Sequence, residues 1–174
     1  YDIPIFNKEL LEEMARKEGY SEKALEKYDE KPVNFGFMPL PYAGGNIPIE
    51  QEIAMKQFEF IKNKADAGES FVIVGRCADF ILKENKNVFK VFVYSNMENK
   101  VKRATEFYGL DKAKAEKEIT RINKLRANHY KHYTEKEWNN PNNYDICINS
   151  DTLGVEKSAD LICEIVNKKT DQLV

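Results

Sequence analysis

Apolar residues occur in short uninterrupted runs, separated by stretches in which they recur at helical spacing. The runs are rich in β-branched residues and do not alternate with polar ones, which favours strands buried on both faces. They predict strands at residues 3–6, 71–74, 88–94 and 144–149. Strands of this kind occur mainly in sheets covered by helices on both sides, so we expect a parallel sheet.

The stretches between these runs predict helices, because their apolar residues return every three or four positions. Side chains that can cap a helix stand at Ser21, Ser95 and Asp111, and Gly68 follows the end of another helix. The expected helices span residues 8–17, 21–29, 49–67, 96–108, 112–133 and 154–168. Strands and helices in this order predict an α/β fold of three layers, a parallel sheet with helices on both faces.

One segment, residues 30–48, fits neither pattern. It is rich in proline and glycine but also contains Phe35, Phe37 and Tyr42, which an ordinary flexible linker would lack. We therefore expect this loop to pack on the domain, either as a pocket wall for a small acceptor molecule or as an interface between subunits.

Length and composition indicate one ordinary globular domain. Of the 174 residues, 42% are hydrophobic and 32% charged, as in folded and not in disordered chains. No apolar run approaches the roughly 20 residues of a membrane span, so we expect a cytoplasmic protein without a membrane partner. Cys77, Cys147 and Cys163 stand far apart in apolar surroundings, which predicts reduced core thiols.

Charge is unevenly distributed, although the net charge is only −2. Residues 119–134 include no acid, and their basic side chains are Arg121, Lys124, Arg126 and Lys131, with His129 and His132 beside them. Such a cluster usually faces anions, the alternative being a solvated helix face. The histidines have no third ligand at useful spacing, so no metal site is expected. The acidic sequence pI of about 5.9 argues against binding to nucleic acid.

Arg76 follows directly on the predicted strand 71–74. A guanidinium at the end of a buried strand must reach solvent, a carboxylate or a bound anion, because burying it unpaired is costly. In open α/β sheets, ligands bind beyond the carboxyl ends of the strands. Arg76 is therefore a candidate anion-binding residue, and a structural pairing with Asp79 is the alternative. The segment 149–154 follows another predicted strand in the same way.

Three motifs occur along the chain in the order "FVIVGRCADFILKENKNVFKVFVYS", "NKLRANHYKHYTEKEW" and "YDICINSDTLG". They resemble the cytidylate kinase-like family, a branch of the P-loop nucleoside monophosphate kinases. The resemblance implies a five-stranded parallel sheet, a mobile helical lid, and transfer of the γ-phosphoryl of ATP to a nucleoside monophosphate or similar small acceptor. It also implies Mg²⁺, bound with ATP through the substrate phosphates.

On this basis the chain is one P-loop kinase-like domain. Its core would be residues 1–19, 68–110 and 144–174, with a small acceptor-side lobe at 20–67 and the lid at 111–138. Arg76 matches the family's Gly-Arg motif, and the lid pattern is matched by Lys124, Arg126 and Tyr130. The resemblance thus implies catalytic roles for Arg76, Lys124 and Arg126, and phosphate contacts for Arg121 and Arg103. The loop that contacts the donor base is matched by Asn149, Ser150, Asp151, Thr152, Leu153 and Gly154.

Helix geometry qualifies the lid assignment. Arg121 and Lys124 are three residues apart and share a face, whereas Arg126 points to nearly the opposite side. Lys124 and Arg126 therefore serve one phosphate pair only if the lid bends.

Two departures from the family pattern keep a second function open. The glycine-rich phosphate loop has no counterpart in these residues, and we expect it ahead of Tyr1; Asn123 stands where the family's lid has an aspartate. The residues after the opening strand also fail to match true cytidylate kinases, so the acceptor is open. The alternative function is a catalytically inactive nucleotide-binding or regulatory module of the same fold. The oligomeric state is open as well.

Overall fold

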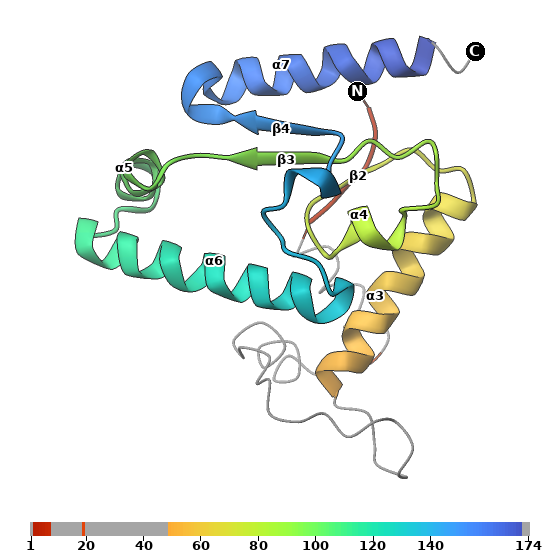
Figure 1. Ribbon diagram of the computed structural model, residues 1–174, viewed down its shortest axis with the longest axis horizontal. Coiled ribbons are helices and arrows are strands. Elements are labelled where there is room, and N and C mark those ends of the chain that lie inside the picture. Colours follow the sequence, from red (N-terminus) through yellow and green to blue (C-terminus); the bar gives the residue numbers. More distant parts are fainter. Residues whose placement is uncertain (1, 8–18, 20–48, 172–174) are drawn as a thin grey trace. The chain divides into compact units, whose positions relative to one another are not determined.

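The computed structural model describes residues 2–7, 19 and 49–171 (Figure 1). The elements are β1 (Ile5–Phe6), α3 (Ile49–Asp66), β2 (Val72–Ile73), α4 (Ala78–Ile81), β3 (Val91–Tyr94), α5 (Met97–Tyr108), α6 (Lys112–Thr134), a 3₁₀ turn (Pro141–Asn143), β4 (Ile146–Asn149) and α7 (Ser150–Asp171). The predicted helices 8–17 and 21–29 and the loop 30–48 lie outside the described residues. The chain divides into two compact units, residues 1–88 with 128–136 and residues 89–127 with 137–174.

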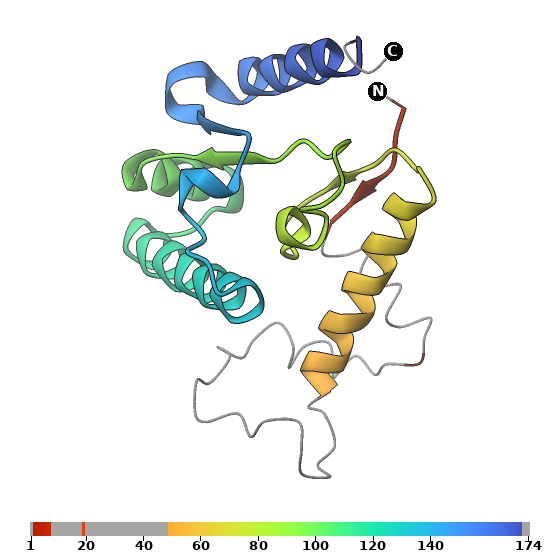
Figure 2. The same cartoon turned by 45° about the vertical axis from the view of Figure 1, so that its right-hand side comes forward.

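The first unit is built on two parallel strands, β1 and β2, which lie side by side (Figure 2). Phe6 pairs in register with Ile73, and its ring meets those of Phe60 and Phe71 edge-on, with centroids 5.3 and 5.2 Å away. This face of the strand pair is covered by α3 and α4, because Ile73 and Phe71 pack against a core made of Ile61, Ala78 and Leu82. Of the predicted apolar run 71–74, only Val72–Ile73 form a strand, and Ile73 is half-buried on the covered face.

The opposite face of this strand pair is exposed. Ile5, Val72 and Val74 leave 59%, 44% and 61% of their surface accessible. Val93 on β3, in the second unit, is 51% exposed. The prediction of strands buried on both faces is thus wrong for the described residues. An apolar run indicates a tendency to be buried, but it does not determine whether an element covers each face.

The second unit also contains a parallel strand pair, with β3 and β4 in register from Val91 opposite Ile146 onward (Figure 1). Phe92 stacks on Tyr144 with ring centroids 4.8 Å apart, and it meets Trp138 edge-on at 5.5 Å. A separate apolar cluster joins α5 to the first turns of α6 through Val101, Ala104, Ala115 and Ile119. Residues 112–127 of α6 belong to this unit, whereas residues 128–134 belong to the first.

Of the two predicted N-terminal caps at α5 and α6, the structure contains one. The side chain of Asp111 accepts hydrogen bonds from the amides of Ala113 and Lys114, at 3.1 and 3.3 Å, which confirms the predicted cap of α6. The predicted cap at Ser95 is wrong. Asn96 caps α5 by accepting from the amide of Asn99 at 2.8 Å.

The chain is an α/β protein with parallel strand pairing, as predicted. Its described residues form two separate two-stranded sheets. The five-stranded, three-layer arrangement implied by the resemblance is not seen among them. All three cysteines lie in the described ranges and none forms a disulfide, but only Cys77 is a core residue; Cys147 is half-buried and Cys163 is exposed. None of the helices in the described ranges is long and apolar enough to cross a membrane.

Candidate functional site

Arg76 lies in a tight turn at the carboxyl end of β2. Gly75, Arg76 and Cys77 have φ angles of 76°, 57° and 55°, so three successive residues adopt the left-handed conformation. Glycine adopts it freely, whereas each non-glycine residue costs about 1–2 kcal/mol. Such strain persists only where the surroundings hold the backbone, and it is often found at functional sites. The turn leaves the Arg76 side chain half-buried.

The turn is held from its carboxyl side. Cys77 is 4% exposed, and its carbonyl oxygen accepts hydrogen bonds from the amides of Phe80 and Ile81, both at 2.9 Å. Burial is the main cause that raises the pKa of the Cys77 thiol to about 12, with the charge of Asp79 adding to it. The thiol is therefore protonated at neutral pH, and Cys77 serves as an apolar anchor and not as a nucleophile.

Asp79 forms a hydrogen bond with a residue of α6, and not an ion pair with Arg76. Its Oδ2 accepts a hydrogen bond of 2.6 Å from the hydroxyl of Tyr130, a residue 51 positions later that is only 4% exposed. The alternative prediction, an ion pair between Arg76 and Asp79, is not seen between these two described residues. The sequence analysis placed Tyr130 in the lid pattern but did not connect it with Asp79.

His129 directly precedes Tyr130 in the sequence and is uncharged at neutral pH. Burial lowers its pKa to about 4, and the positive charges of Arg76 and His132 add to the effect. Its ring packs against Tyr133 with centroids 4.8 Å apart, and Tyr133 meets Phe58 of α3 edge-on at 5.1 Å. The structure thus brings Arg76 and His129, two residues of the predicted site region, into one electrostatic environment.

The remaining cations of the predicted site lie in the second unit, on α5 and α6. The exposed Lys124 and Arg126 form no side-chain hydrogen bond or ion pair with any residue in the described ranges. Arg121 is already paired: its Nε and Nη2 donate to the two carboxylate oxygens of Glu118 at 2.9 and 2.6 Å. Arg103 lies over the ring of Phe107 at 5.5 Å. Lys124 and Arg126 are therefore the cations most available to an anion.

The predicted donor-base loop, residues 149–154, is not a loop in the structure: Asn149 ends β4, and residues 150–154 form the start of α7. Its first polar side chains tie this segment to the end of β3. Asp151 accepts from the Ser95 hydroxyl at 2.5 Å and from the Asn96 amide at 2.7 Å. These bonds, that of Ser95 first, lower the pKa of the Asp151 carboxyl. Ser150 donates to the carbonyl of Tyr94 at 3.1 Å, and the side chain of Asn149 accepts from the amide of Asp151 at 3.0 Å.

The second half of this segment is bonded within α7, where the carbonyl oxygen of Gly154 accepts a hydrogen bond of 2.5 Å from the Ser158 hydroxyl. Thr152, Leu153 and Gly154 are exposed. Gly154 interrupts α7 with φ 77° and ψ 174°, a conformation that is essentially restricted to glycine. Of the segment predicted to contact a base, residues 152–154 are thus the most exposed, and residues 149–151 are half-buried.

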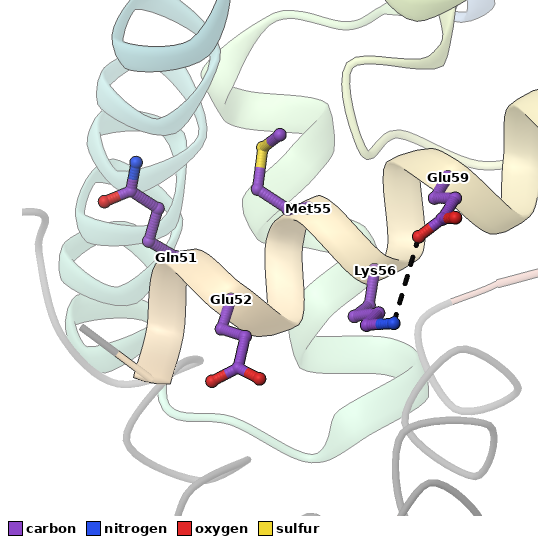
Figure 3. A pocket seen from close by; sticks show the side chains of 5 residues that line it. All are labelled: Gln51, Glu52, Met55, Lys56 and Glu59. Atoms are coloured by element: carbon purple, nitrogen blue, oxygen red, sulfur yellow. Dashed lines mark ion pairs between the residues drawn. The ribbon is translucent and has the colours of Figure 1, made fainter. Parts of the chain in front are cut away.

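Two shallow surface hollows lie elsewhere. One, of about 230 Å³, is lined by Gln51, Glu52, Met55, Lys56 and Glu59, all on α3 (Figure 3). Lys56 and Glu59 form a loose ion pair at 3.9 Å, and Glu52 adds a further negative charge. An acidic surface of this kind does not suit a phosphate group. The other is lined by Ala113, Glu116, Lys117 and Thr120 of α6. Neither hollow contains a predicted site residue.

The residues predicted for the acceptor pocket, Phe35, Phe37 and Tyr42, lie outside the described residues.

Comparison with known proteins identifies the family. In open α/β sheets, ligands bind outside the carboxyl ends of the parallel strands, and Arg76 lies at such an end. Residues 1–152 match the profile of the cytidylate kinase-like family. The crystal structure of an uncharacterized protein from Eubacterium ventriosum ATCC 27560 is also similar. It has 32% sequence identity and a TM-score of 0.73, with 96% of this chain and 84% of that chain covered. No curated protein matches. The chain belongs to the cytidylate kinase-like family, which indicates a nucleotide kinase-like function without naming a substrate.

Proposed function

We propose that the protein is a phosphotransferase that moves the γ-phosphoryl group of ATP to a nucleoside monophosphate or a similar small acceptor. The observation that carries the proposal is the placement of Arg76. Arg76 lies in a strained turn at the carboxyl end of a parallel strand, and the chain is a member of the cytidylate kinase-like family. Strand ends of this type are where α/β proteins bind their ligands.

The chemistry of phosphoryl transfer suits the residues available. The reaction needs little covalent participation by the protein, and catalysis consists mainly of aligning donor and acceptor and stabilising charge on the transferring oxygens. Arginine is well suited because its planar guanidinium binds two phosphate oxygens and stays charged. In this proposal Arg76 contacts the phosphates of the nucleotide, including the one that is transferred, and Lys124 and Arg126 keep the catalytic roles that the family resemblance implies. Arg121 contributes only after exchanging Glu118 for phosphate, and Arg103 is a further phosphate contact.

Divalent metal would be bound by the nucleotide. The described residues include no group of three or more His, Cys, Asp or Glu side chains that could hold a metal ion. A donor set dominated by cations fits phosphate oxygens and not a dedicated metal cage. Mg²⁺ bound between the phosphates of ATP would neutralise their charge during transfer. The residues of this chain would then bind and orient the phosphates from the protein side.

A second candidate function is a nucleotide-binding module without catalytic activity. One sequence feature favours it: Asn123 stands where the family's lid has an aspartate. The cytoplasmic location stays a prediction.

A screen of acceptors separates the two candidates. The purified full-length protein is incubated with ATP, Mg²⁺ and each of the common nucleoside monophosphates, and acceptor-dependent formation of ADP is measured. The phosphotransferase proposal expects turnover with at least one acceptor. ATP binding in calorimetry without acceptor-dependent ADP would contradict it and favour the binding module.

A further inference from the structure

The hydrogen bond between Tyr130 and Asp79 connects two segments that the site needs. Asp79 stands in the first turn of α4, three residues after Arg76. Tyr130 stands near the end of α6, in the part of that helix that belongs to the same unit. Their 2.6 Å contact is partly buried, so it is shielded from competition with water. It is a direct connection between the arginine turn and the basic helix.

Tyr130 is itself firmly held. Its carbonyl oxygen accepts a 2.7 Å hydrogen bond from the hydroxyl of Thr134, a residue that is also buried. One turn along the helix, Tyr133 packs edge-on against Phe58 of α3. The hydroxyl of Tyr130 is therefore held in a fixed position relative to α4.

A second contact joins the same two segments. The ammonium group of Lys136, just beyond α6, lies over the ring of Phe80, the neighbour of Asp79 on α4, at 5.7 Å from the centroid. The four-residue α4 is thus contacted twice from the end of α6. The preceding turn at residues 75–77, with its three left-handed residues, depends on α4 staying in place because Cys77 begins that helix.

From this geometry we infer that Asp79 and Tyr130 are a positioning pair that fixes the turn at residues 75–77 and thereby aims Arg76 at a nucleotide phosphate. The inference rests on the proposed function, because it assigns the pair to the arginine that binds phosphate there. Neither residue needs to touch the nucleotide. His129, the sequence neighbour of Tyr130, is half-buried with its Nε2 atom shielded from solvent. Its uncharged state supports the arrangement, since a protonated imidazole there would repel the Arg76 guanidinium.

The test is a cycle of variants read out by binding of ADP to the full-length protein, measured by titration calorimetry. Tyr130→Phe removes only the hydroxyl and is expected to weaken ADP binding about tenfold, the effect of one hydrogen bond lost from a site-forming contact. Asp79→Ala should give the same loss, and the two substitutions together should give no more than either alone. In an Arg76→Ala background, Tyr130→Phe should change ADP binding by less than about twofold, because the residue through which it acts is gone.

Tyr144→Phe is the matched control. The hydroxyl of Tyr144 also donates a 2.6 Å hydrogen bond, to the carbonyl of Trp138, but in the second unit. It should lower thermal stability to a similar extent as Tyr130→Phe while leaving ADP affinity unchanged. Tyr130→Phe is preferred to larger changes because it removes the hydroxyl and preserves the packing of the ring.

Three results would overturn the inference: wild-type affinity in Tyr130→Phe, an equal loss with and without Arg76, or an equal loss in Tyr144→Phe. The proposed function fails separately: it would be contradicted if the wild-type protein binds ADP but phosphorylates no acceptor. In that case the ADP cycle still decides for or against the positioning pair. Wild-type protein that does not bind ADP would contradict both.

Discussion

The carboxylate of Asp151 and the hydroxyl of Ser95 are joined by a 2.5 Å hydrogen bond across 56 residues of sequence. Ser95 directly follows β3 and Asp151 follows β4, so the bond ties the carboxyl ends of two parallel strands. Asp151 also accepts from the Asn96 amide, and Asn96 in turn caps α5. One side chain thus orders two strand ends and the start of a helix.

Removing this contact should weaken the second unit. Asp151→Ala and Ser95→Ala should each lower the midpoint of thermal unfolding. The double variant should be little worse than Asp151→Ala alone, because both remove the same bond. Circular dichroism melts of the four proteins measure this. Fully additive losses would mean that the two side chains act independently.

His129 predicts a loss of stability in mild acid. Its folded pKa of about 4 lies below the ordinary value of 6.5, so the unfolded chain binds the proton more readily. The neutral imidazole therefore contributes full stability above about pH 6.5, and this contribution is lost as the pH falls toward 4. Each unit of pKa is worth about 1.4 kcal/mol, so the complete loss is about 3 kcal/mol.

Urea unfolding between pH 7 and pH 4.5 tests the role of His129. His129→Gln should show a smaller decline than the wild type, whereas His132→Gln should keep most of the decline that His129 causes. An identical acid dependence in the wild type and in His129→Gln would contradict the assignment of a buried neutral imidazole.

The two exposed cations Lys124 and Arg121 should differ in their effect on anion binding. Arg121 is paired with Glu118, which also lowers the pKa of that carboxyl, whereas Lys124 forms no ion pair within the described residues. If α6 contacts phosphate, Lys124→Ala should weaken ATP binding about tenfold, the scale of one charge-assisted hydrogen bond. Arg121→Ala should cost less, because its pairing with Glu118 competes. Calorimetric titration with ATP at two salt concentrations measures both. Equal losses would show that the Glu118 pair does not compete.

Replacing Gly154 by alanine should lower the stability through backbone strain alone. No atom lies within 4 Å of a Cβ added at Gly154 or at Gly109, so neither substitution by alanine causes a clash. Gly154 has φ 77° and ψ 174°, whereas Gly109 has the milder left-handed values of 62° and 21°. We expect Gly154→Ala to cost about 2–3 kcal/mol and Gly109→Ala about 1 kcal/mol. Urea unfolding compares them, and equal costs would argue against a glycine-specific kink in α7.

Local signals predicted α3, α5 and α6 well, whereas α7 begins four residues before its predicted start and α4 was not among the predicted helices. Ile49–Asp66 and Lys112–Thr134 agree with the predicted helices to within one residue at each end, because Gly68 and Asp111 are strong end signals. The cap of α5 was misplaced by one residue. Ser95 and Asn96 are equally good caps, and the choice is made by Asp151, which binds the Ser95 hydroxyl from 56 residues away. Sequence patterns do not reveal such a partner.

The candidate site was only partly predictable for the same reason. Arg76 stands out because a cation directly follows an apolar strand, and the structure confirms its place at the strand end. The contact of Asp79 with Tyr130 could not be read from spacing, since an arginine three residues away was the nearer partner. The basic residues of α6 were identified by charge, but the pairing of Arg121 with Glu118 lies just outside the acid-free segment that drew attention to them.

Turnover of Arg76 variants tests the central claim most directly. With the acceptor found in the screen, Arg76→Ala should lower kcat at least about a thousandfold, the scale of an arginine that stabilises a transferring phosphoryl group. Arg76→Gly should be equally inactive yet more stable than Arg76→Ala by about 1 kcal/mol, because glycine relieves the left-handed strain. Near-normal turnover in either variant, with the fold intact by circular dichroism, would contradict the account and return Arg76 to a structural role.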